Sequence, residues 1–161
     1  MKTYCPYPDC KAIYEIASGD KLSLFNANCP KCNRSGRVKP LEIIDKLIAK
    51  EEKINRANLN CSNTGHNGFN VLLEDIRSLW NVGSIFRTAD AIAVSKIYLC
   101  GITGCPPRSE ISKTALGAEQ DIPWTYMPFA LDAINILKKA GTTIFGLERN
   151  DQSVDLVTFL K

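Results

Sequence analysis

The feature that most constrains the fold is a set of four cysteines near the start of the chain. Cys5 and Cys10 are separated by four residues, Cys29 and Cys32 by two, and eighteen residues lie between the pairs. This arrangement is typical of two metal-binding turns in which each thiolate occupies one corner of a tetrahedron around Zn²⁺. Residues 1–39 contain few large aliphatic side chains, and so short a segment usually needs a metal or disulfides to fold. We therefore predict a small structural zinc domain over these residues.

The alternative for this segment is four unrelated buried cysteines. A catalytic zinc is disfavoured, because four thiolates leave no open position for water. The segment is similar to the zinc-ribbon modules of nucleic-acid enzymes, although its first pair has a wider spacing than the usual two-residue turn. The remaining cysteines, Cys61, Cys100 and Cys105, lack paired spacing, and Cys100 is interpreted as a buried small hydrophobe at the end of an apolar run. We assign no role to His66, the single histidine.

The formal net charge of +3 is unevenly distributed along the chain. Residues 1–40 carry seven Lys and Arg against three Asp and Glu, so they hold +4 and the remainder holds −1. Four thiolates with one Zn²⁺ would lower the total to +1. Overall charge is thus weak evidence for a polyanionic partner. The basic residues near the second cysteine pair are equally consistent with RNA contacts and with a solvated face; they are Lys31, Arg34, Arg37 and Lys39.

The sequence carries no targeting or membrane signal. No apolar stretch approaches the roughly 20 residues that span a bilayer, and the first residues lack a basic segment followed by an apolar run. We expect a cytoplasmic protein with no membrane contact, whose cysteines are not paired as disulfides in a reducing compartment.

Beyond residue 40 the apolar pattern predicts an α/β domain. Residues 40–57 have a helical period that begins at a proline, and an Asn-, Ser- and Gly-rich loop follows, so 40–68 is interpreted as a connecting helix and loop. From residue 69 to 161, short aliphatic runs alternate with helical periods, which is typical of a parallel sheet covered by helices. The predicted strands are 69–73, 97–100 and 142–147, with a further extended segment at 122–127. The predicted helices are 81–93 and 128–140, and one more element is expected at 109–117.

The most informative motif lies in residues 72–91, between a predicted strand and a predicted helix. Asn81 stands where a helix N-cap is favoured, and Gly83 lets another backbone or a ligand come close. Arg87 falls off the apolar stripe of a helix that rises from the carboxyl end of a strand, where open α/β sheets place their ligands. Each residue alone would be ordinary, but together they indicate a binding site.

This motif resembles the first motif of the SpoU (TrmH-type) RNA methyltransferases, N-x-G-x-I-x-R-T-A. Every motif residue is present, namely Asn81, Gly83, Ile85, Arg87, Thr88 and Ala89. The resemblance continues through residues 111–119 and covers the chain from about residue 69 to its end. It implies transfer of a methyl group from S-adenosylmethionine to a ribose 2′-hydroxyl of tRNA or rRNA, by a protein that forms a homodimer in its full-length form.

The resemblance also implies roles for particular residues. Arg87 matches the arginine that activates the 2′-hydroxyl and Asn81 the asparagine that supports it, while Leu147 matches a position that lines the S-adenosylmethionine pocket. Lys113 and Arg108 would contact the RNA backbone. Because a guanidinium stays protonated at accessible pH, we expect Arg87 to clamp a phosphate and stabilise the developing alkoxide rather than act as a base.

Family members continue with an N-E-containing loop and an S-x-N segment that form a trefoil knot and most of the donor pocket. No match to either follows Leu147, so we expect an N-terminal half without the knot, truncated and inactive alone, with an incomplete S-adenosylmethionine site. The alternative is a non-catalytic, zinc-stabilised RNA-binding module. A nucleotide-dependent oxidoreductase is disfavoured, because no G-x-G-x-x-G follows the first predicted strand.

Overall fold

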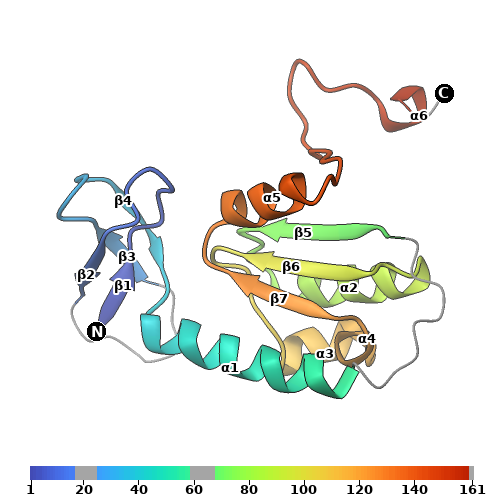
Figure 1. Ribbon diagram of the computed structural model, residues 1–161, viewed down its shortest axis with the longest axis horizontal. Helices are drawn as coiled ribbons and strands as arrows, with labels where there is room; N and C mark the ends of the chain where they lie inside the picture. The colour runs from blue at the N-terminus through green and yellow to red at the C-terminus, as the bar shows by residue number, and fades with distance from the viewer. Residues whose placement is uncertain (17–24, 59–67, 160–161) are drawn as a thin grey trace.

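The computed structural model describes residues 1–16, 25–58 and 68–159 of the 161 (Figure 1). His66 and Cys61 lie outside these ranges. Within them, no helix is both long enough and apolar enough to cross a membrane.

The first part of the chain forms two antiparallel hairpins. Strand β1 (Lys2–Tyr4) pairs with β2 (Ile13–Glu15), and β3 (Phe25–Asn28) pairs with β4 (Ser35–Val38). One cysteine pair lies in the turn of each hairpin, and each turn ends on a residue with left-handed backbone, at φ 47° for Lys11 and φ 56° for Asn33. We call residues 1–16 and 25–39, the two hairpins and the residue that follows them, the N-terminal module.

Helix α1 (Leu41–Asn58) follows the module and confirms the predicted connecting helix. It begins directly after Pro40, whose fixed φ and missing N–H suit the start of a helix. Ile44 is buried in the core beneath the sheet. The helix therefore links the module to the rest of the chain along its lower side (Figure 1).

The second part of the chain is built on a three-stranded parallel sheet, as predicted. Its strands β5 (Asn70–Glu74), β6 (Lys96–Cys100) and β7 (Trp124–Met127) lie in the order β5-β6-β7. Helix α2 (Leu79–Ala91) connects the first two strands, and the short helices α3 (Ser109–Ala115) and α4 (Ala118–Asp121) precede the third. The carboxyl ends of all three strands point toward the N-terminal module (Figure 1).

The two faces of the sheet are covered unequally. Alternate residues of the strands pack with α2, α3, α4 and Ile44 into the main core, whose largest fully buried side chains are Trp124 and Phe86. The other face is covered by α5 (Ala130–Lys139), which buries Ala130 and Ala133 against Cys100. Cys100 is fully buried, which confirms its interpretation as a small hydrophobe.

The strand predicted for residues 142–147 is not formed. After α5 the chain turns at Gly141, at φ 81°, and projects away from the sheet toward the short helix α6 (Leu156–Phe159) (Figure 1). A strand needs a neighbour for its backbone groups, and among the described residues β5 is hydrogen-bonded only to β6. The prediction of a buried strand is therefore wrong: no sheet position receives the run, and its large apolar side chains Phe145 and Leu147 are exposed.

Contacts between side chains seat the N-terminal module on the carboxyl edge of the sheet. Lys11 forms an ion pair of 2.7 Å with Asp132 and lies 4.7 Å from the ring centre of Phe129. Lys39 donates a hydrogen bond of 2.8 Å to the carbonyl of Thr103, and its ammonium lies 4.3 Å from the ring centre of Tyr126. These contacts come from the first hairpin and from the residue that follows the second, so the module is held against the strand ends at two points.

Candidate functional site

The four cysteines of the N-terminal module meet at one point. Their sulfur atoms all lie within 4.8 Å of one another, and the Sγ atoms of Cys5 and Cys32 are 3.6 Å apart, those of Cys10 and Cys29 3.7 Å. A tetrahedron with Zn–S bonds of about 2.3 Å has edges of about 3.8 Å. The donor set and its spacing therefore fit one Zn²⁺ with a closed shell of four thiolates.

The thiols of this cluster have different acidities. Burial raises the pKa of the Cys5 thiol to about 12. The backbone N–H of Arg34 and then its guanidinium lower the pKa of Cys32 to about 6. A bound dication would favour the deprotonated form of all four sulfurs, so the cluster has the chemistry of a metal site and no free ligand position for catalysis.

The start of α2 differs in one respect from the prediction. Ser78, not Asn81, is the N-cap: its φ and ψ are −84° and 115°, and its hydroxyl accepts a hydrogen bond of 3.2 Å from the backbone N–H of Asn81. Asn81 thus occupies the third helical position, and its side chain is exposed. Serine and asparagine are both strong N-cap residues, so residue type alone did not distinguish them.

Gly83 is the point of closest approach between α2 and α3. A Cβ atom at this position would collide with the hydroxyl of Thr114 and the backbone carbonyl of Ile111, and would lie 3.1 Å from the backbone nitrogen of Ala115. Thr114 also donates a hydrogen bond of 3.0 Å to the carbonyl of Trp80. The expectation that Gly83 permits a close backbone approach is confirmed, and the approaching backbone is that of α3.

The contact between α2 and α3 places Arg87 beside Lys113. Both side chains are exposed, and both line a shallow groove between the two helices. The other residues of the groove are small, hydroxylated or aliphatic: Ser84, Thr88, Ala91, Thr114 and Leu116. The groove presents two cations and several hydrogen-bonding hydroxyls, a combination suited to a phosphate group.

Trp80 is a residue of this surface that sequence reasoning missed. It stands seven positions before Arg87, so two helical turns bring both onto one side of α2, whereas Asn81 lies about 120° away from Arg87 around the axis. Its indole is 49 % exposed, and the ammonium of Lys113 lies 5.6 Å from its ring centre. The seven-residue spacing was the available signal, but an apolar side chain at the start of a helix is usually assigned to the core.

Two further predicted residues lie apart from this groove. Arg108 stands before α3 as its N-cap, with its guanidinium 3.7 Å from the carboxylate of Glu110, and it does not line the groove. Leu147 lies in the projecting segment after α5 and is 96 % exposed. The described residues build no pocket around Leu147, so they do not fit an enclosed site for a methyl donor.

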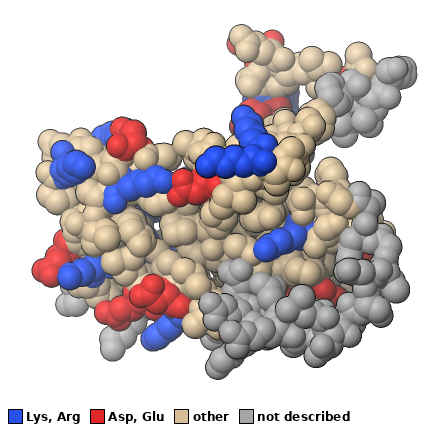
Figure 2. Space-filling view, in the orientation of Figure 1, with Lys and Arg blue, Asp and Glu red and all other residues tan. Residues whose placement is uncertain are grey.

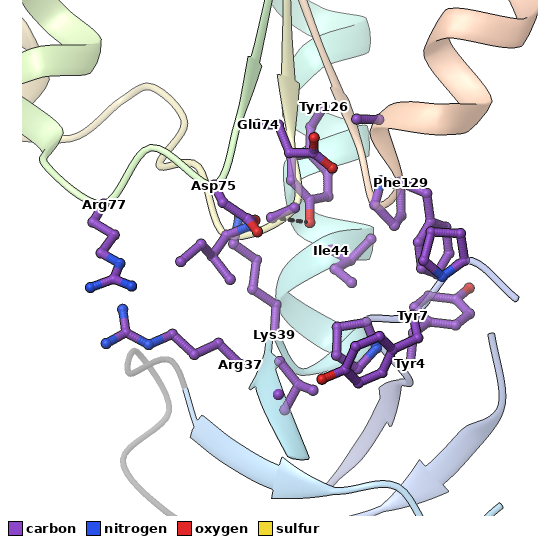
Figure 3. Close-up of a pocket in the computed structure, with 18 of the residues that line it drawn as sticks. Tyr4, Tyr7, Arg37, Lys39, Ile44, Glu74, Asp75, Arg77, Tyr126 and Phe129 are labelled. Atoms are coloured by element: carbon purple, nitrogen blue, oxygen red, sulfur yellow. Dashed lines mark hydrogen bonds between the residues drawn. The ribbon is translucent and has the colours of Figure 1, made fainter. Parts of the chain in front are cut away.

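A second cavity, of about 500 Å³, lies where the N-terminal module meets the carboxyl edge of the sheet (Figure 3). The strand ends contribute Glu74 and Asp75, and Arg77 follows them in the loop to α2. The module contributes Arg37 and an aromatic wall that includes Tyr4. Burial and then the neighbouring Asp75 raise the pKa of Glu74. This is the edge at which open α/β sheets bind their ligands.

Surface charge does not mark a binding site on the face of the molecule seen in Figure 2. On this face Lys and Arg side chains are interspersed with Asp and Glu, without one extended basic patch.

Together these features define the class: an α/β protein with a parallel sheet, a cavity at its carboxyl edge, and a four-cysteine module seated on that edge. The chain belongs to the SpoU rRNA Methylase family, whose sequence model matches residues 68–161. The resemblance inferred from the motif around Asn81 and Arg87 is thereby confirmed.

Curated relatives extend the similarity to most of the chain. A putative TrmH family tRNA/rRNA methyltransferase of Staphylococcus epidermidis is 27 % identical over 143 residues, which cover 88 % of this chain and 53 % of that protein. Proteins of the same description from the COL and Newman strains of Staphylococcus aureus are each 26 % identical over 144 residues, covering 89 % of this chain and 54 % of theirs. The chain thus spans about half the length of the curated relatives it matches.

Proposed function

We propose that this chain is the N-terminal part of an RNA methyltransferase that transfers a methyl group from S-adenosylmethionine to a ribose 2′-hydroxyl of tRNA or rRNA. The observation that carries the proposal is the family match over residues 68–161, which includes the complete first motif. The whole protein would act as a homodimer, as the family resemblance implies. One Zn²⁺ on Cys5, Cys10, Cys29 and Cys32 would hold the N-terminal module together.

In this proposal Arg87 is the catalytic residue of this chain, and it acts on the ribose of the target nucleotide. Its guanidinium would bind the phosphate next to the target nucleotide, fix the ribose, and stabilise negative charge as the 2′-oxygen loses its proton to solvent water. Lys113 faces the same groove and would neutralise a neighbouring phosphate. The methyl donor supplies an electrophilic sulfonium methyl, and its pocket would be built by residues other than the described ones.

Trp80 supports the same groove as an RNA surface. An exposed indole beside the ammonium of Lys113 offers a stacking platform for an unpaired base, and such stacking contributes about 1–3 kcal/mol per base. Asn81 would support the site from the adjacent face of α2, and Arg108 would contact the backbone beyond the groove.

RNA binding by the chain tests these roles directly. Fluorescence anisotropy with a labelled single-stranded RNA should show that Arg87→Gln and Trp80→Ala each weaken binding, whereas Trp80→Phe restores most of the loss because a ring remains. Arg149→Gln is the matched control, since Arg149 is exposed in the projecting segment. Equal affinities for Arg87→Gln and Arg149→Gln would remove Arg87 from the RNA site.

Methyl transfer is tested on the full-length gene product with labelled S-adenosylmethionine and RNA, followed by nuclease digestion. We expect the label on ribose-methylated nucleosides, and label on a base instead would refute the 2′-hydroxyl target. A second candidate function is an RNA-binding module without catalysis, favoured by the absence of a donor pocket around Leu147 among the described residues. Tight RNA binding by a full-length product that takes up no S-adenosylmethionine in calorimetry would establish it.

A further inference from the structure

The basic residues of the N-terminal module have different environments. Arg34 forms an ion pair of 2.6 Å with Asp9 and stacks 4.0 Å from the ring centre of Tyr7. Lys39 is engaged with Thr103 and Tyr126 at the sheet edge. Arg37 differs from both, because within residues 1–16, 25–58 and 68–159 its guanidinium has neither an ion pair nor a hydrogen bond. It lines the cavity between the module and the sheet.

Arg77 approaches the same space from the other side. It follows the end of β5, it is exposed, and its guanidinium likewise has no acidic partner among the described residues. Figure 3 shows the side chains of Arg37 and Arg77 pointing toward one another at the mouth of the cavity. Two guanidinium groups that face each other repel unless an anion lies between them.

The acidic residues of the cavity do not fill that role. The carboxylate of Asp75 accepts a hydrogen bond of 2.9 Å from the backbone N–H of Ile102, which turns it toward the strand ends. Glu74 lies beside it at the end of β5, and Lys39 lies below them (Figure 3). The cavity is lined by three cationic side chains and two carboxylates. Lys39 lies beside the carboxylates and offsets one of them, so the uncompensated positive charge lies at the two arginines.

We propose that Arg37 and Arg77 form a clamp for one phosphodiester group of a single-stranded RNA that passes between the N-terminal module and the sheet. Guanidinium groups bind phosphate oxygens through paired, charge-assisted hydrogen bonds. A cavity of about 500 Å³ has room for one nucleotide, and Tyr4 and Phe129 line the side of the cavity opposite the two arginines (Figure 3). The clamp rests on the proposed function, since it takes RNA as the ligand, but it is distinct from the groove of Arg87 and Lys113.

The test measures how binding of a single-stranded RNA depends on salt, using the chain with Arg37→Gln, Arg77→Gln or both. Each single variant should weaken binding several-fold. The double variant should lower the slope of log K against log salt by roughly 0.7, the value for one phosphate of a single strand, because both arginines hold the same phosphate. Arg149→Gln should leave the slope unchanged. A double variant that behaves like Arg149→Gln would overturn the clamp.

A charge reversal gives an independent readout that does not need RNA. Arg37→Glu would place a carboxylate opposite Arg77, so its thermal unfolding midpoint should exceed that of Arg37→Gln. A midpoint equal to or below that of Arg37→Gln would show that the two side chains do not face each other, and would refute the geometry.

Further measurements identify the source of the phosphate and distinguish failure of the clamp from failure of the proposed RNA methyltransferase function. Inorganic phosphate should displace RNA no better than potassium chloride of equal ionic strength; stronger displacement would mean a free-phosphate site and overturn the RNA clamp. Failure of the unsubstituted chain to bind any RNA would refute both the clamp and the RNA surface of the proposed function. RNA binding that responds to Arg87→Gln but not to the Arg37 and Arg77 variants would refute the clamp alone.

Discussion

Replacement of Gly83 by alanine should destabilise the protein although it improves helix propensity. Alanine stabilises the interior of a helix by about 1 kcal/mol relative to glycine. Against this, the new methyl group would collide with the hydroxyl of Thr114 and the carbonyl of Ile111. Thr114 can change rotamer, but the carbonyl belongs to the backbone of α3, so the helices must separate. Overpacking of this kind typically costs about 1–3 kcal/mol, and the backbone clash places this case in the upper part of that range.

The expected net loss is therefore about 1–2 kcal/mol, measured as the free energy of unfolding in urea. With a urea slope of about 2 kcal/mol per molar, the midpoint should fall by roughly 0.5–1 M. Ser84→Ala is the control, because this neighbouring position is exposed and gains propensity without a clash. If Gly83→Ala unfolds at the same midpoint as Ser84→Ala or above it, the close packing of α2 on α3 is refuted.

Three further substitutions probe other parts of the structure. Cys29→Ser should lower zinc content well below one ion per chain in elemental analysis, while Cys100→Ser should retain one ion because Cys100 lies outside the cluster; equal zinc content would exclude the four-cysteine site. Lys39→Met should keep the packing of the side-chain stem but leave the carbonyl of Thr103 with only the weak thiol donor of Cys105, at a cost of about 1 kcal/mol in urea unfolding; Lys2→Met, at an exposed position, should change little. Asp75→Ala should lower the free energy of unfolding by about 2 kcal/mol, because it removes the acceptor for the backbone N–H of Ile102 and places alanine in a left-handed backbone conformation at φ 54°. Asp75→Asn should lower it by less. Similar losses for both variants would contradict this explanation.

The elements that sequence analysis predicted well are those encoded by local spacing. The cysteine pairs identified two turns, and the apolar periods identified α1, α2, α5 and the three parallel strands. The close approach of another backbone to Gly83 was predictable, because a glycine between Val82 and Ser84 in a helical period has few other roles. In each case a single stretch of sequence contains the whole signal.

The features that it missed depend on residues distant in sequence. Arg37 and Arg77 are forty positions apart, and nothing local indicates that they face one another. The run at residues 142–147 has the composition of a buried strand, yet pairing depends on a neighbour that the run itself does not encode. The cap of α2 was misplaced by three residues, since Ser78 and Asn81 are both suitable types and only the backbone geometry decides between them.

The seating of the four-cysteine hairpins on the strand ends would give the proposed Zn²⁺ an effect on one binding site and not on the other. Withdrawal of zinc by a chelator would unravel one wall of the cavity, with Arg37, but would leave α2 and α3 with their own core. Chelation should therefore abolish the contribution of Arg77 to RNA affinity, whereas the contribution of Arg87 should persist. The proposed Zn²⁺ lies away from the catalytic residue Arg87. It would in this way determine whether the protein binds an RNA strand at one site or at two.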